Sequence, residues 1–265
     1  MSRIDELFER TRAENRAALV GYLPAGFPTK EQSVAAVEAM VAGGVDLVEV
    51  GLPYSDPVMD GPVIQAAADT ALSAGTRIAD VLDVVRAAAA VAPTVIMTYW
   101  NPVERYGVDR FAGALADAGG SGLITPDLIP DEGAEWIAAA DTHGLDKVFL
   151  VAPSSTDERL AMTADAASGF IYATAVMGVT GAREQTSSLA PELVGRLRKV
   201  TDKPVGVGLG VSNGVQAGEV AEFADAVIVG SALVRCLLDA PDEAAGIAAV
   251  RTLAEDLRSG VERKA

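Results

Sequence analysis

The sequence is poor in the residues that bind metals and form disulfides. It has one cysteine, Cys236, and one histidine, His143. A single cysteine excludes a disulfide within the chain, and one cysteine with one histidine cannot supply the ligands of a zinc site. We therefore expect no metal ion and a reducing, cytoplasmic location.

Basic residues and long apolar runs are scarce as well. The 21 Lys and Arg face 37 Asp and Glu, which gives a formal net charge of -16, whereas nucleic acids and anionic membranes select clustered cations. Residues 1–18 are charged throughout and lack the apolar centre of a signal peptide. No apolar run is long enough to span a membrane. Neither nucleic acid nor a membrane is an expected partner.

The sequence does contain a regular alternation of apolar strands and helical segments. Half of its residues are hydrophobic and only 5% are aromatic, a composition that suits helices packed on a parallel sheet. Eight short runs rich in apolar or β-branched residues are predicted strands: 17–23, 45–51, 93–99, 121–126, 145–151, 168–174, 203–210 and 224–230. Segments with helical period lie between them, among them 30–44, 108–120, 131–144 and 189–200.

Eight such units of about 30 residues predict an α/β fold, a single (β/α)8 TIM barrel that occupies residues 1–265 as one domain. An open doubly wound sheet is the alternative. An extra N-terminal helix over residues 2–14, with Ser2 as its N-cap, is expected to cover the bottom of the barrel. The tail, 260–265, is expected to be a frayed, solvated end.

Two connections are longer than a barrel needs. A loop, LPYSDPVMDGP, and a further helix over 63–75 separate strands 2 and 3, and a second long loop, 175–191, follows strand 6. Long loops in a compact domain are usually functional. Both follow strands, so both are expected at the carboxyl-terminal face, where barrel active sites lie.

An acidic residue singles out the second strand. Alternation places Leu47, Glu49 and Gly51 on one face, and a carboxylate inside a barrel is costly unless it is paired or used in chemistry. One interpretation of Glu49 is a structural glutamate satisfied by a neighbouring hydroxyl or lysine. The other is a general acid–base catalyst whose pKa is raised by apolar walls.

Two further acids lie in the loop after this strand. Asp60 precedes Gly-Pro and a new helix, so it is either a helix cap or an acid that the loop carries over the barrel mouth. Asp56 follows Ser55, and these two side chains can form local turn hydrogen bonds. The loop residues alone leave these alternatives open.

Glycines recur where the late strands end. The turns Gly178–Gly181, Gly208–Gly210 and Gly230–Ser231 follow strands 6, 7 and 8. Glycine lets backbone N–H groups approach an anion closely, and the segment after Gly230 opens a short helix whose amino terminus attracts negative charge. A phosphate site is predicted here, the alternative being that the glycines only permit tight turns.

Together these features resemble the α subunit of tryptophan synthase over essentially the whole chain. VEVGLPYSDPVMDGPVIQ (48–65) is similar to the signature stretch of that family, and LPAGFP, NPVERYG, PDLIPDE, FIYAT, GVTGAR and GLGVSN are further family-like segments in the expected order. The resemblance implies a (β/α)8 carbon–carbon lyase of tryptophan biosynthesis. Its reaction is the retro-aldol cleavage of indole-3-glycerol phosphate to indole and glyceraldehyde 3-phosphate.

The resemblance also implies roles for individual residues. The essential acids fall on Glu49 and Asp60. The implied phosphate-binding backbone is that of Gly181, Gly210, Gly230 and Ser231, with Tyr172 and Thr180 near the substrate, and Tyr22, Leu123, Tyr172, Leu209 and Ile228 are candidate walls for the indole ring. Positions that face or couple to the partner are Pro53, Asp56 and Asp127. The implied partner is a β subunit carrying pyridoxal phosphate, in an α2β2 heterotetramer, and no cofactor is expected on this chain.

Departures from the family pattern are modest. Tyr54 stands where many relatives have Phe, and Val58-Met59 stand where many have a smaller residue. Val176 and Met177 occupy positions near which many relatives have an arginine. These departures bear on loop closure and leave the expected chemistry unchanged.

Three residues outside the implied site remain to be assigned. His143, at a helix end before Gly144, suits a structural role; Cys236 is expected in the core; and Trp100 either lines the pocket or contacts a partner.

The alternative function is another phosphosugar-binding barrel enzyme, an isomerase or synthase of aromatic amino-acid biosynthesis. A third is a non-catalytic regulatory subunit, against which the acids on strand 2 and its loop argue.

Overall fold

Eight parallel strands close into a barrel in the computed structural model, which describes residues 1–174, 189–208 and 210–263. Each strand pairs with the next along the chain, and the last pairs with the first, so no strand edge is left open. The strands are β1 (Ala18–Pro24), β2 (Leu47–Gly51), β3 (Thr94–Met97), β4 (Gly122–Thr125), β5 (Asp146–Val151), β6 (Ile171–Thr174), β7 (Val205–Gly208) and β8 (Ala226–Val229). The predicted (β/α)8 barrel is confirmed, and the open sheet is excluded.

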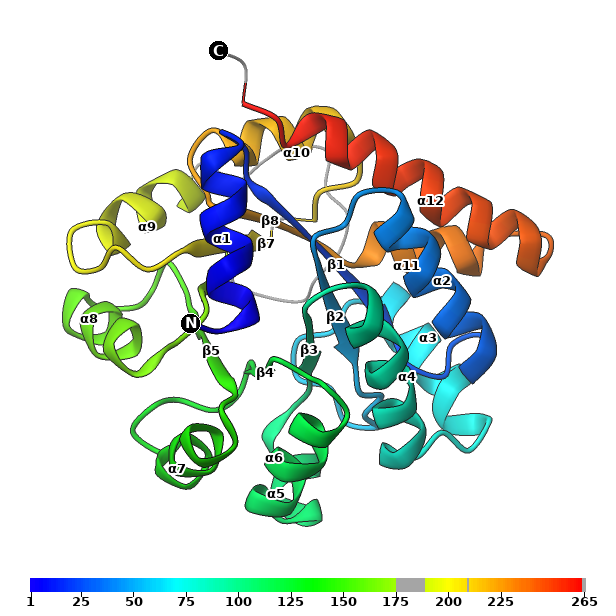
Figure 1. Ribbon diagram of the computed structural model, residues 1–265, viewed down its shortest axis with the longest axis horizontal. Helices are drawn as coiled ribbons and strands as arrows, with labels where there is room; N and C mark the ends of the chain where they lie inside the picture. Colours follow the sequence, from blue (N-terminus) through cyan, green and yellow to red (C-terminus); the bar gives the residue numbers. More distant parts are fainter. Residues whose placement is uncertain (175–188, 209, 264–265) are drawn as a thin grey trace.

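Helices surround this barrel on its outer side (Figure 1). Those in the described residues are α1 (Arg3–Ala13), α2 (Lys30–Ala42), α3 (Pro62–Ser73), α4 (Ile78–Val91), α5 (Trp100–Tyr106), α6 (Val108–Asp117), α7 (Ala134–His143), α8 (Asp157–Ala166), α9 (Leu189–Leu197), α10 (Gly214–Ala221), α11 (Ser231–Leu238) and α12 (Glu243–Gly260). The predicted strands overrun the observed ones by one to three residues at several ends, within the usual uncertainty of element boundaries. None of the helices described is long and apolar enough to cross a membrane.

The extra helix α1 closes the amino-terminal end of the barrel. It begins with a capping box, in which the Asp5 N–H donates to Ser2 Oγ at 3.2 Å and the Ser2 N–H donates to Asp5 Oδ2 at 2.8 Å. Its buried residues Ile4, Leu7 and Phe8 join the apolar cluster inside the barrel, where the Phe8 and Phe170 rings lie 6.0 Å apart. The predicted helix and its Ser2 cap are confirmed, and the opposite end of the barrel stays free for a site.

The strand residues divide between two apolar layers. Inward-facing residues form the cluster under α1, and they include Ala18, Val20, Leu47, Val95, Ile124, Val148, Phe170, Ala226 and Ile228. Alternate residues, such as Val48 and Val50, pack outward against the helices. This division fixes which strand residues can reach the barrel mouth.

A buried ion pair ties the amino-terminal ends of β1 and β2 together. Arg16 Nη1 and Nη2 donate to Asp46 Oδ2 and Oδ1 at 2.6 and 2.7 Å, and both side chains are nearly buried. The Leu19 N–H also donates to Asp46 Oδ2 at 2.9 Å. Fork geometry and an added backbone donor are the conditions under which a buried pair is well satisfied.

The prediction of a frayed tail is wrong as far as residue 263. Val261 is fully buried, and its carbonyl accepts the Ala17 N–H at 3.1 Å. The Arg263 guanidinium donates to the carbonyls of Ala221 and Ala224 at 3.0 and 2.9 Å. The charged composition suggested solvation, but one apolar residue and free helix-end carbonyls hold the tail against the barrel.

Replacing Asp46 by Asn is expected to lower the free energy of unfolding by about 3–5 kcal/mol, because the buried Arg16 loses its buried counterion and keeps only its pair with the half-exposed Glu14. Urea unfolding at neutral pH, followed by circular dichroism, measures the change. The control is Arg86→Met, which breaks an exposed pair with Asp83 and is expected to cost no more than about 1 kcal/mol. Equal losses in the two variants would contradict this role of the buried pair.

Candidate active site

Glu49 faces the barrel interior near its open, carboxyl-terminal end. Leu47 belongs to the interior cluster, so alternation turns Glu49 inward two residues further along β2. The residue is 2% exposed, and its Oε2 atom has no hydrogen-bond partner within the described part of the chain. An inward-facing carboxyl with an unpaired oxygen is a poor structural element and a suitable proton donor.

Burial keeps this carboxyl neutral. Loss of hydration, and secondarily the negative charge of Asp60, raises the pKa of Glu49 to about 8. Glu49 is therefore mostly protonated at neutral pH. The structure matches the expectation of a raised pKa, which followed from the apolar walls of the strand.

Asp60 is held by a residue that the sequence reasoning missed. The Tyr99 hydroxyl donates to Asp60 Oδ1 at 2.9 Å and accepts the Met59 N–H at 3.1 Å. Burial raises the pKa of Asp60, and the Tyr99 hydrogen bond acts against that rise. Helix α3 has Gly61 as its N-cap and no side-chain cap, so Asp60 is not the helix cap that one interpretation suggested.

A chain of contacts joins three loops at this end of the barrel. The Tyr54 and Tyr99 rings lie 5.5 Å apart, and Asn101 Nδ2 donates to the Tyr54 hydroxyl at 3.0 Å. The Asp127 carboxylate accepts the N–H of Trp100 at 2.9 and 3.1 Å. The loops after β2, β3 and β4 are thus one connected surface.

The predicted partner-facing residues lie on or beside this surface. Asp127 is exposed, as is Asp56, which accepts a hydrogen bond from Ser55 Oγ at 2.6 Å. Pro53 is buried and lines a cavity of about 470 Å³ together with Pro102, Tyr106 and others. The local Ser55–Asp56 bond does not occupy both carboxylate oxygens, so it leaves the partner-facing role of Asp56 open.

Two tyrosines stand in the barrel mouth beside glycines. A Cβ placed on Gly208 would lie 2.5 Å from the Tyr172 hydroxyl oxygen, and one placed on Gly51 would lie 2.6 Å from Tyr22 Cζ. The glycines therefore make room for the phenol groups. Burial raises the pKa of both tyrosines, with a further contribution from the Glu49 carboxyl in each case.

The late glycines meet at one side of the same rim. Gly208 pairs with Ile228 across β7 and β8, so Gly210 and Gly230 follow at neighbouring positions. Gly210 has φ +72, a left-handed conformation that favours glycine. Helix α11 begins at the buried Ser231, with Gly230 as N-cap and no side-chain cap. Its first N–H groups are oriented as an anion site requires.

Comparison with known proteins agrees with this geometry. The sequence model of the family described as "Tryptophan synthase alpha chain" matches residues 8–262. The chain belongs to that family. The tryptophan synthase alpha chain of Salinispora arenicola is 64% identical over 100% of both chains, and that of Mycobacteroides abscessus is 58% identical over 98% of both. The solved structure of Mycobacterium tuberculosis tryptophan synthase superposes with a TM-score of 0.93, at 55% identity over 99% of both chains.

Membership of the tryptophan synthase alpha chain family confirms the expected function. The chain is a lyase with the alpha-subunit role in tryptophan biosynthesis. The alternative, an isomerase or synthase of another barrel family, is excluded by a match of this extent. A second solved structure, subunit alpha from Legionella pneumophila, superposes with a TM-score of 0.86 at 34% identity over 98% of both chains, so the fold persists at much lower identity.

Several predicted residues lie outside the described residues. They are Thr180, Gly181 and Leu209 of the predicted substrate contacts, the departures Val176 and Met177, and most of the long loop predicted after strand 6. Among the described wall candidates, Ile228 lies in the interior cluster and Tyr172 packs against it. Tyr22 follows the inward-facing Val20 by two residues on β1 and so faces the interior as well. Leu123 was assigned wrongly. It pairs with Ile96 on the outward face, and Ile124 is the inward residue of β4.

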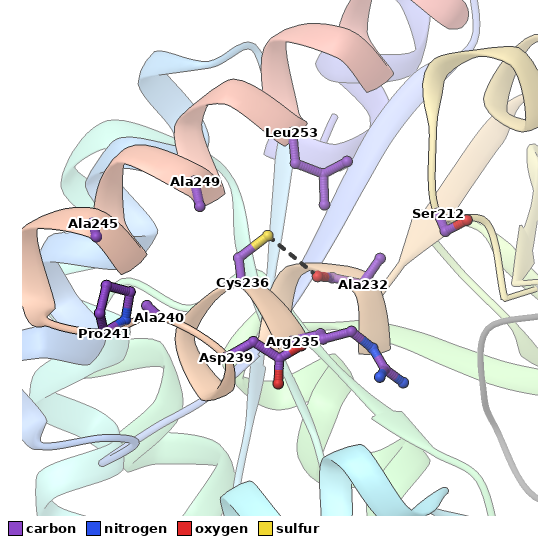
Figure 2. A pocket seen from close by; sticks show the side chains of 10 residues that line it. All are labelled: Ser212, Ala232, Arg235, Cys236, Asp239, Ala240, Pro241, Ala245, Ala249 and Leu253. Carbon is purple, nitrogen blue, oxygen red and sulfur yellow. Dashed lines mark hydrogen bonds between the residues drawn. The ribbon is translucent and has the colours of Figure 1, made fainter.

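Cys236 is not the core residue that was predicted. It is only partly buried and lines a cavity of about 440 Å³ between α11 and α12. Figure 2 shows its Sγ atom pointing toward α12, where the small side chains of Ala245 and Ala249 leave the space open. Glu49 and Asp60 do not line this cavity. His143 ends α7 and contacts Asp109 Oδ1 at 3.0 Å, in line with the predicted structural role.

No group of three or more His, Cys, Asp or Glu that could hold a metal ion occurs in residues 1–174, 189–208 and 210–263. The buried acids Glu49 and Asp60 and the tyrosines beside them gather in the barrel mouth, where Tyr99 donates to Asp60. The described residues therefore support acid–base chemistry at this site.

The raised pKa of Glu49 predicts a pH-dependent stability. Between about pH 4.5 and 8 the folded chain binds a proton that the unfolded chain has released, so stability falls as pH rises through this range. Glu49→Gln removes the effect. The variant is expected to match the wild type near pH 4 and to exceed it by a few kcal/mol, at most about 5, near pH 9.

Urea unfolding across this pH range measures the difference, and the exposed substitution Glu104→Gln is the control. A wild type whose stability relative to Glu49→Gln stays constant from pH 4 to pH 9 would show that Glu49 ionises normally in the folded chain.

Proposed function

We propose that Glu49 and Asp60 carry out the cleavage of indole-3-glycerol phosphate to indole and glyceraldehyde 3-phosphate. The observation that supports this most strongly is the neutral, inward-facing carboxyl of Glu49 beside a second acid that a tyrosine holds from another loop. Two acids in different environments can hold different protonation states at one pH. The reaction needs both states.

Glu49 acts first as an acid. Its proton moves to C3 of the indole, which becomes tetrahedral while the ring nitrogen takes up positive charge. Asp60, ionised, accepts a hydrogen bond from the indole N–H and stabilises that charge. The Tyr99 hydroxyl keeps the Asp60 carboxylate in place and favours its charged form.

Glu49 then acts as a base. Its carboxylate takes the proton of the 3′-hydroxyl of the glycerol chain, the hydroxyl-bearing carbon becomes the aldehyde carbon, and the electron pair of the broken C–C bond returns to the indole ring. Glu49 is protonated again at the end of the cycle. One residue serves as acid and base in turn, and a pKa near neutrality suits both tasks.

The phosphate is proposed to bind at the amino terminus of α11. Ser231 and Gly230 supply backbone N–H groups there, and Gly210 reaches the same rim from β7. Gly181, outside the described residues, is proposed as the fourth contributor. Backbone dipoles hold the anion without lysines, which fits a chain with a net charge of -16. Binding at the phosphate then positions the indole between the acids.

The connected surface of three loops is proposed as the contact with a β subunit. Asp56 and Asp127 are exposed on it, and Val58 and Ile129 expose 76% and 42% of their surface nearby in sequence. Exposed apolar side chains beside charged ones are typical of interfaces. The proposed assembly is α2β2, with pyridoxal phosphate on the β subunit and no cofactor on this chain.

Glu49→Gln and Asp60→Asn test the proposal directly. Each is expected to lower kcat for indole-3-glycerol phosphate cleavage by about 10²- to 10⁴-fold, because a proton donor or the charge that stabilises the intermediate is lost. Turnover is measured as indole release by the purified chain, and calorimetry checks that substrate still binds. Activity of either variant within a few-fold of the wild type would refute that residue's role, and the exposed Glu104→Gln is the control.

Tyr99→Phe tests the support of Asp60. Loss of the hydrogen bond is expected to lower kcat about tenfold and to raise the pKa of Asp60. Because Asp60 must be ionised, the acid limb of the pH–rate profile then moves to higher pH. Tyr106→Phe controls for removal of a tyrosine hydroxyl elsewhere. An unchanged acid limb would mean that Tyr99 only holds the loop.

A further inference from the structure

Tyr22 is the direct cross-strand neighbour of Glu49. The two residues are paired in the register of β1 and β2, and both face the barrel interior. Tyr22 is 7% exposed. Neighbouring strands lie about 4.7–4.9 Å apart, so residues paired in register on one face of the sheet are lateral neighbours.

Gly51 shows where the Tyr22 hydroxyl lies. Gly51 is on the same face of β2 as Glu49, two residues nearer the barrel mouth. A Cβ on Gly51 would lie 2.6 Å from Tyr22 Cζ and closer still to the hydroxyl oxygen. The phenol hydroxyl thus occupies the position that the side chain of residue 51 would take, immediately above Glu49.

The opposite side of the Tyr22 ring faces the proposed phosphate site. A Cβ on Gly230 would lie 3.4 Å from Tyr22 Cδ1. The ring therefore extends from the rim at Gly230 to β2 at Gly51. Its hydroxyl end is turned toward β2, the strand that carries Glu49.

The groups that face this hydroxyl are acids and other phenols. Burial, then the charges of Asp60 and Glu49, and then Tyr99 and Tyr172, raise the pKa of Tyr22, so its hydroxyl keeps its proton. Glu49 is influenced by Asp60. In the described part of the chain no lysine, arginine or histidine contributes to either group. A carboxylate formed at Glu49 thus depends on hydroxyl donors.

We propose that Tyr22 is a positioning residue that donates a hydrogen bond to Glu49 when Glu49 is ionised. The inference rests on the proposed acid–base role of Glu49. The bond forms after the proton has moved to indole C3, and it orients the carboxylate for the second step, removal of the proton from the 3′-hydroxyl. Tyr172 also lies within the influence of Glu49, but it approaches from β7, above Gly208, whereas Tyr22 is on the strand paired with that of Glu49.

Tyr22→Phe removes the donor and keeps the ring. Because a hydrogen bond to the charged form lowers a carboxyl pKa, its loss is expected to move the basic limb of the pH–rate profile up by about 0.5–1 pH unit. We expect kcat to fall about tenfold, with KM within about threefold of the wild type. Tyr106→Phe is the matched control, with both quantities unchanged.

A second readout does not depend on turnover. The difference in stability between ligand-free wild type and Glu49→Gln grows with pH from the pKa of Glu49 in the unfolded chain and levels off at its pKa in the folded chain. The pH midpoint of this change therefore reports the ionisation of Glu49. Tyr22→Phe is compared with Tyr22→Phe/Glu49→Gln in the same way. An upward shift of this midpoint supports the inference. Gly51→Ala, which displaces the phenol, is expected to shift it in the same direction.

The outcomes separate the two proposals. If the wild type does not release indole, or if Glu49→Gln retains activity, the proposed function fails whatever Tyr22→Phe does. If the wild type is active and Glu49→Gln is not, but neither the basic limb nor the stability midpoint moves in Tyr22→Phe, only the positioning role of Tyr22 is overturned.

Discussion

The chemistry of this barrel depends on one constraint, that water cannot hydrate the Glu49 carboxyl at the inner face of β2. Without hydration the charged form is disfavoured, and the negative Asp60 adds to the effect. The acid therefore keeps its proton at neutral pH. Burial raises the pKa of Asp60 as well, but this residue lies nearer the surface, and the Tyr99 hydrogen bond acts against the rise. A pair of acids with different proton affinities results from the fold.

The barrel architecture produces this constraint through strand register and small side chains. Alternation along β2 turns Leu47 and Glu49 to the same face, and α1 closes the lower end over Leu47 with Ile4, Leu7 and Phe8. Gly51, next on that face, leaves room for a phenol rather than for a side chain of its own. The carboxyl is thus enclosed below by apolar residues and bordered above by a hydroxyl, while the loops after the strands complete the mouth.

Local pattern predicted most of the fold and one half of the candidate site. Short apolar runs indicated the strands, and alternation along β2 placed Leu47, Glu49 and Gly51 on one face, because a period of two needs no information from elsewhere. The Tyr99–Asp60 bond joins residues 39 positions apart. The sequence pattern places Tyr99 at the end of a predicted strand, and only the adjacency of β2 and β3 brings it to the loop that carries Asp60. Leu123 was misassigned for a similar reason, since its inward or outward direction depends on pairing with β3. The tail was misjudged from its charges, because its contacts are made with α10 and β1.

The most direct test of this account is the protonation state of Glu49 itself. In ligand-free protein carrying ¹³C-labelled glutamate, the side-chain carboxyl resonance of Glu49 is identified by its absence in Glu49→Gln and followed from about pH 4 to 10. The account predicts a titration midpoint near pH 8. A midpoint near 4.5, the ordinary value for a glutamate, would show that the carboxyl is ionised at neutral pH and would contradict its role as the proton donor.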